Sequence, residues 1–204
     1  PAGTINVVPW SLGMPAHPEN AARVLAGGKA IEIDVGVCDE MTFLILTSVG
    51  LDGRIMARVP RSLKRHLGRV AVGVRGVADW LTYSYPRVKV KADGRELEGS
   101  FAAVCNLPHY GGSTVLAPAA RPTSGRLELI VFRGRGRAAT LGFARDLVLG
   151  RHVERPDVEA LTVDEVEIDG PDELPLEIDG DGLDLRPPHH IRLAPCRLKI
   201  LVPV

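Results

Sequence analysis

The sequence lacks a net charge, because its 204 residues carry 25 basic and 25 acidic side chains. A balanced chain produces no overall field that attracts a nucleic-acid backbone, so we expect no nucleic-acid partner. Any attraction to an anionic membrane surface must therefore come from a local cluster of cations. Hydrophobic residues make up 45% of the chain, which at this length is enough to bury a core of ordinary size.

Cysteine is also scarce, with three residues far apart and no Cys-x-x-Cys spacing: Cys38, Cys105 and Cys196. This pattern indicates reduced thiols in an intracellular setting, each a small core residue. No apolar run reaches the roughly 18 residues of a membrane-spanning helix, and no charged segment precedes an apolar stretch near Pro1. We expect a cytoplasmic chain that does not cross a membrane, and the start at Pro1 indicates a piece of a longer polypeptide.

Most of the chain consists of short segments whose residue pattern is typical of β-strands. Alternation of apolar and acidic residues predicts a half-buried strand over 30–38. The Asp93-Gly94 pair between two apolar stretches predicts a hairpin over 86–105. Further strands are expected at 42–49, 126–133, 161–168, 174–178, 190–194 and 197–202.

Helical patterns are fewer, at 18–26, at 60–82 with interrupting glycines, and at 137–149. In the last of these, the inward positions are expected to be Leu141, Ala144, Leu147 and Val148. Many short strands with three helices favour an antiparallel β-sandwich with added helices, an α+β fold that is mainly β, over a βαβ fold. No internal repeat or low-complexity linker divides the chain.

Basic side chains gather around the start of the expected helix 60–82: Arg58, Arg61, Lys64, Arg65, His66 and Arg69. Such a run is usually a solvated face. A more specific interpretation also remains open. The cluster could meet anionic lipid head groups at roughly 1 kcal/mol per cation, which would make the protein peripherally membrane-associated.

Two acidic positions could carry chemistry. Asp52 follows the apolar strand 42–49, where its carboxylate could bind a substrate hydroxyl or cap the next helix. Asp179-Gly180-Asp181 resembles part of a calcium loop, but Leu183 stands at the third ligand position and the glycine at the sixth is missing, so an EF-hand is rejected. A plain turn is the competing reading for this segment.

Histidines give weaker signals. His189-His190 could suggest zinc, but no cysteine or acidic residue has suitable local spacing, so no metal site is expected there. His152 follows a helix, where a cap or a satisfied polar contact is the commoner role.

The stretch from Phe101 to Leu129 holds the motifs that carry a resemblance: Asn106, Tyr110-Gly111-Gly112, Pro118-Ala119 and Gly125-x-Leu127. Their order and spacing resemble the C-terminal domain of diacylglycerol kinase-like and sphingosine kinase-like lipid kinases. The same resemblance continues near the N-terminus in Pro1, Gly3, Thr4, Asn6, Leu12, Gly13 and Pro15. It covers essentially all 204 residues.

This resemblance implies an inter-domain hinge at 1–15 and a β-sandwich lipid-substrate domain at 16–204. By the same resemblance, an apolar slot would hold the acyl chain, Asp52 would meet the head group, and Asp181 would have a catalytic role in the phosphate and metal network. The residues expected to face the nucleotide are Gly3, Thr4, Asn6 and Arg65.

The nucleotide-binding half of such kinases is missing, because the chain has neither their Gly-Gly-Asp-Gly-Thr motif nor a Walker loop. ATP and Mg²⁺ would serve the complete enzyme, with none expected on this chain alone. Ser124 replaces an aspartate that helps hold a structural cation in bacterial relatives, so we expect no metal at that loop.

The function implied is the C-terminal part of a lipid kinase that transfers the ATP γ-phosphate to a lipid hydroxyl of the diacylglycerol or sphingoid type, inactive alone. Its expected partners are the lipid substrate, the missing nucleotide-binding domain and a membrane surface, with a homodimer left open. Two alternatives are a non-catalytic lipid-binding or regulatory module and a protein-interaction sandwich without an apolar slot.

Overall fold

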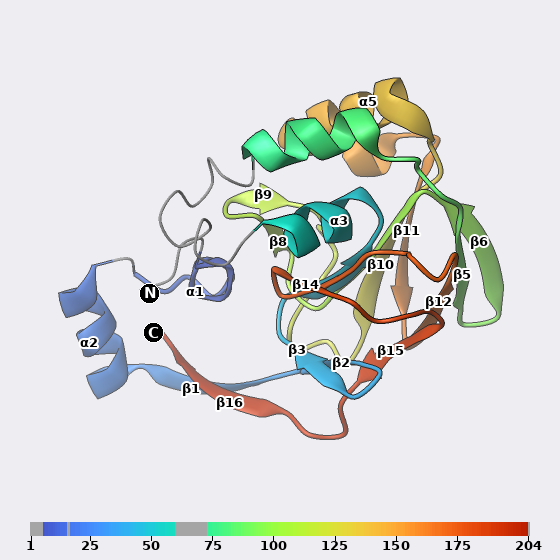
Figure 1. Cartoon of the computed structure of the whole chain (residues 1–204). Coiled ribbons are helices and arrows are strands. Elements are labelled where there is room, and N and C mark those ends of the chain that lie inside the picture. The colour runs from blue at the N-terminus through green and yellow to red at the C-terminus, as the bar shows by residue number, and fades with distance from the viewer. Residues whose placement is uncertain (1–5, 16, 60–72, 204) are drawn as a thin grey trace.

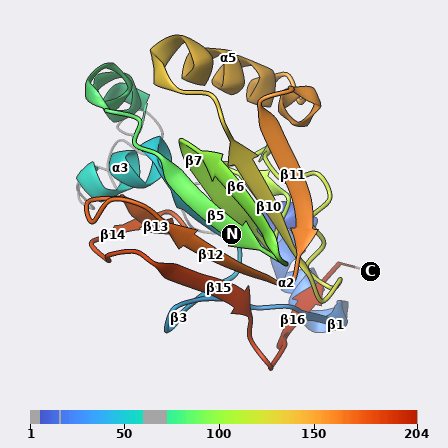
Figure 2. The same ribbon diagram turned by 90° about the vertical axis from the view of Figure 1, so that its right-hand side faces the viewer.

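Two six-stranded antiparallel sheets pack face to face in the computed structural model, which describes residues 6–15, 17–59 and 73–203 (Figure 1, Figure 2). In spatial order, the first sheet contains β11 (Val158–Val163), β10 (Leu127–Phe132), β7 (Phe101–Cys105), β4 (Leu46–Val49), β13 (Leu176–Ile178) and β14 (Asp181–Leu183). The second contains β3 (Met41–Phe43), β2 (Gly36–Cys38), β15 (His189–Leu193), β12 (Glu165–Asp169), β5 (Val88–Ala92) and β6 (Arg95–Gly99). The expected β-sandwich is confirmed.

Apolar side chains from both sheets fill the space between them. Leu129 on β10 lies opposite Val104 on β7, and both are fully buried in this core together with Ile168 of the second sheet. The first sheet is also covered on its other face, so all six residues of β10 are buried. Burial on both faces explains why its sequence is continuously apolar rather than alternating.

The chain passes from one sheet to the other at corners that the hydrophobic pattern does not reveal. Ser100 separates β6 from β7, and Asp164 separates β11 from β12. The predicted strands 30–38 and 42–49 are interrupted as well, at Asp34–Val35 and Leu44–Ile45. The pattern continues through such corners because buried residues resume within two positions of each interruption, although in a different sheet.

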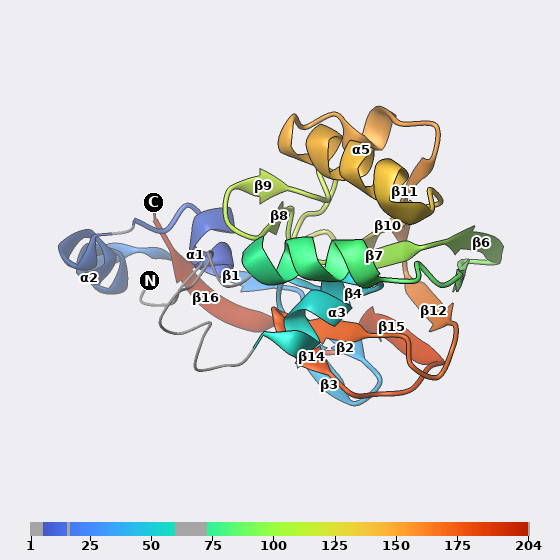
Figure 3. The ribbon, with the colours of Figure 1, turned by 45° about the horizontal axis from the view of Figure 1, so that its top comes forward.

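Beyond the sandwich, β1 (Lys29–Ile33) and β16 (Leu198–Val202) pair as a two-stranded ribbon. The ribbon runs away from the sandwich to α2 (Pro18–Gly27), which lies at the opposite end of the molecule from β6 (Figure 1, Figure 3). The helix expected at 18–26 is thus confirmed.

Helices cover the outer face of the first sheet. They are α3 (Leu51–Arg58), α5 (Gly136–Val148) and a helical stretch over 73–82 (Figure 3). The remainder of the expected helix, 60–72, lies outside the described residues. Across the described parts of the chain, no helix is both long and apolar enough to span a membrane.

The predicted inward face of α5 is partly wrong, because Leu141 and Val148 are 59% and 78% exposed. Phe143 is buried instead and stacks on Phe132, with ring centroids 4.6 Å apart. Asp146 is buried beside Arg155, at 2.7 Å. Tertiary contacts from the sheet below therefore set the buried face of the helix.

The long loop after β7 is ordered by local and distant contacts. It contains a small hairpin of β8 (His109–Tyr110) and β9 (Thr114–Val115). The buried Asn106 amide donates to the carbonyls of Asp34 and Leu44, at 2.8 and 3.0 Å. After α5 comes the 3₁₀ turn η1 (His152–Glu154), where His152 Nε2 lies 2.7 Å from the Leu116 carbonyl oxygen and makes the polar contact expected for this residue. Its Nδ1 has no partner among the described residues.

Candidate functional site

Asp52 lies in the first turn of α3, directly after β4, and is buried. The turn between the two elements requires a glycine at position 50, whose φ is 116° and whose missing Cβ would lie 2.7 Å from the Ser100 carbonyl oxygen. This tight turn directs the start of α3 back over the sheet, so the Asp52 carboxylate lies among sheet residues rather than in solvent.

Three side chains from three other elements surround this carboxylate. Ser48 on β4 donates its hydroxyl to Asp52 Oδ2 at 2.7 Å, and the Tyr110 hydroxyl on β8 donates to Asp52 Oδ1. Ser48 Oγ also lies 3.0 Å from Oε2 of Glu177 on β13, which is likewise buried. A serine hydroxyl therefore links two carboxyl groups that are 125 positions apart in sequence.

The single hydrogen of the Ser48 hydroxyl cannot serve both carboxylates. If it is donated to Asp52, the contact with Glu177 is a hydrogen bond only when Glu177 carries a proton and donates it to Ser48 Oγ. Tyr110 also donates to Asp52, which suits an ionised Asp52 that accepts from both neighbours. The geometry thus assigns the proton to Glu177 and the negative charge to Asp52.

Electrostatics agree with that assignment. Burial, and then the charge of Asp52, raise the pKa of Glu177 well above its ordinary value. Burial and the same charge also raise the pKa of Tyr110, so its phenol stays protonated as a donor. One buried negative charge is shared among Asp52, Ser48, Tyr110 and Glu177, which we call the acidic network.

The turn that contains Asp181 adjoins this network. The Gly180 N–H donates to Glu177 Oε1, and exposed Asp181 follows as the first residue of β14. Asp179 has a different task, since its carboxylate accepts the N–H groups of Leu44, Ile45 and Leu46 at 2.8, 2.8 and 3.1 Å. Asp181 therefore lies one residue beyond a backbone group that bonds Glu177, and it pairs with Ile178 in the sheet.

Asn6 is the N-cap residue of α1 (Val7–Ser11). At the other end of this helix, Ser11 Oγ lies 2.9 Å from His109 Nδ1, and His109 precedes Tyr110 on β8. Gly3, Thr4 and Arg65 lie outside the described residues.

An apolar pocket of about 190 Å³ opens beside the acidic network. Its walls come from α3, α5 and the sheet, with Asp52 and Tyr110 as two of its polar lining residues. The apolar lining is Leu51, Ile55, Phe101, Leu116, Phe132, Phe143, Ala144 and Leu147. The volume is below the roughly 300–1,000 Å³ of drug-sized ligand sites, so it suits part of one hydrocarbon chain.

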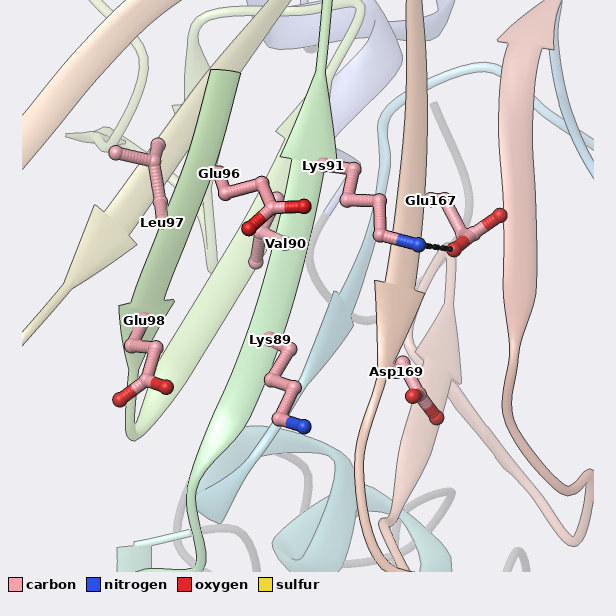
Figure 4. A pocket seen from close by; sticks show the side chains of 8 residues that line it. All are labelled: Lys89, Val90, Lys91, Glu96, Leu97, Glu98, Glu167 and Asp169. Atoms are coloured by element: carbon pink, nitrogen blue, oxygen red, sulfur yellow. Dashed lines mark hydrogen bonds and ion pairs between the residues drawn. The ribbon is translucent and has the colours of Figure 1, made fainter. Parts of the chain in front are cut away.

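A second hollow of about 490 Å³ lies on the outer face of β5, β6 and β12, and its lining is mostly charged (Figure 4). Lys91 Nζ lies 2.9 Å from Glu167 Oε1, and the strand register places Lys89 between Glu98 and Asp169. Side chains of opposite charge thus face one another across three neighbouring strands. Such cross-strand pairs stabilise a solvated sheet face. This hollow therefore gives no indication of a substrate site.

Residues 46–202 match the family described as the YegS C-terminal NAD kinase beta sandwich-like domain. The chain belongs to this family. The matched residues include all four members of the acidic network and the whole of α5.

Similar proteins agree with this assignment. "Probable lipid kinase YegS" of Escherichia coli O1:K1 is 26% identical over 206 residues, which cover 100% of this chain and 67% of that protein. The Salmonella paratyphi A protein of the same name is 27% identical with the same coverage. A Bacillus anthracis structure described as a diacylglycerol kinase has a TM-score of 0.71 at 19% identity, covering 99% of this chain and 65% of the other, and supports the fold.

This member of the YegS C-terminal family spans about two thirds of the length of these relatives. From the sequence, Asp52 was selected as a site residue and Tyr110 was quoted only as part of a family motif, whereas Ser48 and Glu177 were missed. Ser48 is a small polar residue inside an apolar strand, and Glu177 stands in Leu-Glu-Ile, which reads as ordinary alternation. A polar residue inside a strand that is covered on both faces was the one signal that could have pointed to these two residues.

Proposed function

We propose that the chain is the lipid-substrate domain of a kinase that transfers the ATP γ-phosphate to a lipid hydroxyl of the diacylglycerol or sphingoid type. The observation that carries this proposal is the buried Asp52 carboxyl group in the lining of an apolar pocket. An apolar wall with a few fixed polar groups is the usual construction of a site that binds a greasy molecule and orients its polar end.

In this proposal, the hydrocarbon chain enters between α3 and α5 and the acceptor hydroxyl donates to Asp52. A carboxylate offers about four lone-pair positions, so Asp52 can accept this bond in addition to those from Ser48 and Tyr110. Glu177, Ser48 and Tyr110 keep the carboxylate ionised and fixed, which pre-organises it for a substrate donor.

The nucleotide would come from the upstream part of a longer protein. Residues 1–15 are inferred to be the hinge to that part, with Gly3, Thr4 and Asn6 near the nucleotide and Arg65 on its phosphates. ATP with Mg²⁺ supplies the phosphoryl group, and phosphates commonly hold Mg²⁺ together with one or two carboxylates. Asp181 is the proposed carboxylate from this chain, and residues 16–204 form the lipid domain.

The first test compares this 204-residue chain with a chain extended upstream by its natural sequence, using labelled ATP and detergent-dispersed lipid acceptors. Transfer of label to lipid is expected only for the extended chain, because the general base is expected on the missing half. Equal rates for both chains would refute the two-part arrangement. Lipid that binds without any transfer in the extended chain would instead support a non-catalytic lipid-binding module.

The second test is Asp52→Asn in the extended chain, with Asp169→Asn as the matched control on the exposed face of β12. Loss of a charged acceptor for the substrate hydroxyl should lower kcat/KM for lipid by about 10-fold to 100-fold and leave KM for ATP unchanged. An equal effect of the two variants would remove Asp52 from the substrate site.

The third test narrows the pocket. Ala144→Trp on α5 adds bulk at a lining position, whereas Leu141→Trp adds bulk at an exposed position of the same helix. The first variant should shift the preferred acceptor towards shorter acyl chains, and the second should not. Unchanged chain-length preference in both variants would show that hydrocarbon binds elsewhere.

A further inference from the structure

The turn between β2 and β3 lies in the second sheet, on the side of the sandwich away from the helices that cover the acidic network. Asp39 in this turn has a φ of 54° and is held against β15 by two backbone contacts. Its N–H donates to the His190 carbonyl at 2.8 Å, and its Oδ1 accepts the His190 N–H at 2.8 Å. The turn is therefore fixed to β15, directly beside His189.

Three metal-binding side chains meet at this turn. Cys38 Sγ, an Asp39 carboxylate oxygen and a His189 ring nitrogen all lie within 4.8 Å of one another. His189 Nδ1 is 2.9 Å from Asp39 Oδ2. Within the described residues, no other group of three or more such side chains is gathered in this way. We propose that Cys38, Asp39 and His189 form a binding site for Zn²⁺.

His189 presents its Nδ1 to the proposed site. Its side chain is fully buried, and Nδ1 lies 2.9 Å from Asp39 Oδ2. A neutral imidazole nitrogen and a carboxylate oxygen are both zinc ligands, so the ion would take the place of the proton between these two atoms.

The donor set and its dimensions fit the ion. Zinc takes sulfur at about 2.3 Å and nitrogen or oxygen at about 2.0–2.2 Å, so tetrahedral ligand atoms lie roughly 3.3–3.7 Å apart. The three ligand atoms already lie within 4.8 Å of one another, so closing to that spacing needs side-chain shifts of about 1.5 Å at most. Asp39 is exposed, which gives the ion a route in and leaves a fourth position for water.

The Cys38 thiol is protonated without the ion. Burial, and then the Asp39 charge, raise its pKa to about 12, and the Thr47 hydroxyl is its other polar neighbour. Zinc binds the thiolate, so coordination releases the thiol proton to solvent. An uncharged buried thiol explains how the core tolerates Cys38 when no ion is present.

The test titrates the metal-stripped chain with Co²⁺, which reports a thiolate ligand by its charge-transfer absorption, and then with Zn²⁺, counted by mass spectrometry of the bound metal. One metal per chain is expected. At a Zn²⁺ concentration of about 100 times Kd, Tm should rise by roughly 5–10 °C, and a chelator should reverse the rise. If the chain binds no metal at micromolar Zn²⁺, the proposed site is refuted.

Matched variants identify the ligands. Cys38→Ser should abolish the charge-transfer band and His189→Gln should weaken binding at least 10-fold, whereas the exposed controls Cys196→Ser and His190→Gln should change neither. If the buried variants fail to fold, the exposed Asp39→Asn variant decides, with an expected 10-fold to 100-fold loss of affinity. Binding that Asp39→Asn leaves unchanged, or that Cys196→Ser removes, would refute the proposal.

Discussion

Ser48 has one hydroxyl hydrogen and two carboxyl neighbours, and this imbalance determines the charge of the acidic network. Asp52 Oδ2 and Glu177 Oε2 lie 2.7 and 3.0 Å from its Oγ. A second negative charge on Glu177 would be buried, would lie close to the first and could not share the single Ser48 hydrogen, so the folded chain retains a proton on Glu177. Stability and proposed substrate binding therefore depend on the same hydrogen bonds.

Glu177→Gln is predicted to change how stability depends on pH. The folded chain keeps a proton that the unfolded chain releases near the ordinary pKa of 4.5, so this contribution is complete below about pH 4.5 and is lost as pH rises towards the raised pKa of Glu177. The amide mimics the protonated acid and should remove this decline, up to about 1.4 kcal/mol per pH unit. Urea unfolding of both chains from pH 5 to pH 9 measures how the unfolding free energy depends on pH.

The control for this variant is Glu165→Gln, at an exposed position of β12. It should leave the pH dependence of the wild-type chain unchanged. A wild-type chain whose stability rises across the same pH range would show that Glu177 is ionised in the folded state.

Tyr110→Phe and Tyr83→Phe form a matched pair at the residue scale. The Tyr110 hydroxyl donates to buried Asp52, whereas the buried Tyr83 hydroxyl has no partner among the described residues. Loss of the first should cost about 1–3 kcal/mol of unfolding free energy, and loss of the second should be near neutral or stabilising. Chemical denaturation at pH 7 separates them, and equal costs would contradict the role given to Tyr110.

At the element scale, α3 is held in place by close backbone contact with β13 and β14. A Cβ at Gly53 would overlap the Pro175 carbonyl, and a Cβ at Gly182 would overlap the backbone of Ala57. These two glycines let the helix lie directly on the strands, so the position of Asp52 depends on the packing of α3 as well as on the turn at Gly50.

Gly182→Ala is predicted to push β14 away from α3 and to cost about 1–3 kcal/mol or more, because the added methyl meets backbone that cannot move aside cheaply. The control is Gly27→Ala at the end of α2, where nothing lies within 4 Å of the new atom and helix propensity improves. Urea midpoints compare the two. A Gly182→Ala chain as stable as the control would show that α3 and β14 separate freely.

At the scale of the whole molecule, the sandwich should unfold as one unit. The chain crosses between the sheets at Ser100 and Asp164, so neither sheet contains a continuous stretch of sequence that could fold alone. Residues from both sheets also share one buried core. Local loss of packing in one sheet is therefore transmitted to the other.

Leu129→Ala should lower the unfolding free energy by about 2–5 kcal/mol, because the side chain is fully buried between the sheets. Tryptophan fluorescence and far-ultraviolet circular dichroism should still report one coincident transition. Val148→Ala, at a position 78% exposed on α5, should change stability by less than about 0.5 kcal/mol. Two separated transitions in the Leu129→Ala chain would contradict a single cooperative unit.

The sequence by itself determined the fold class, most of the strands and the helix at 18–26, because alternation and turn residues act over a few neighbouring positions. It also marked Asp52, which follows an apolar strand. It did not reveal where strands change sheet, since burial continues on both sides of Ser100 and Asp164. Likewise, the inward face of α5 was mispredicted at Leu141 and Val148.

Only the tertiary structure decided which polar residues meet. Glu177 reaches Asp52 through Ser48 because β13 pairs with β4, and Cys38 and Asp39 reach His189 because β2 pairs with β15. Local spacing around His189-His190 could not show that Asp39, 150 positions away in the sequence, meets the His189 ring. Antiparallel pairing joins residues by strand order and register, which depend on long-range packing that no local pattern specifies.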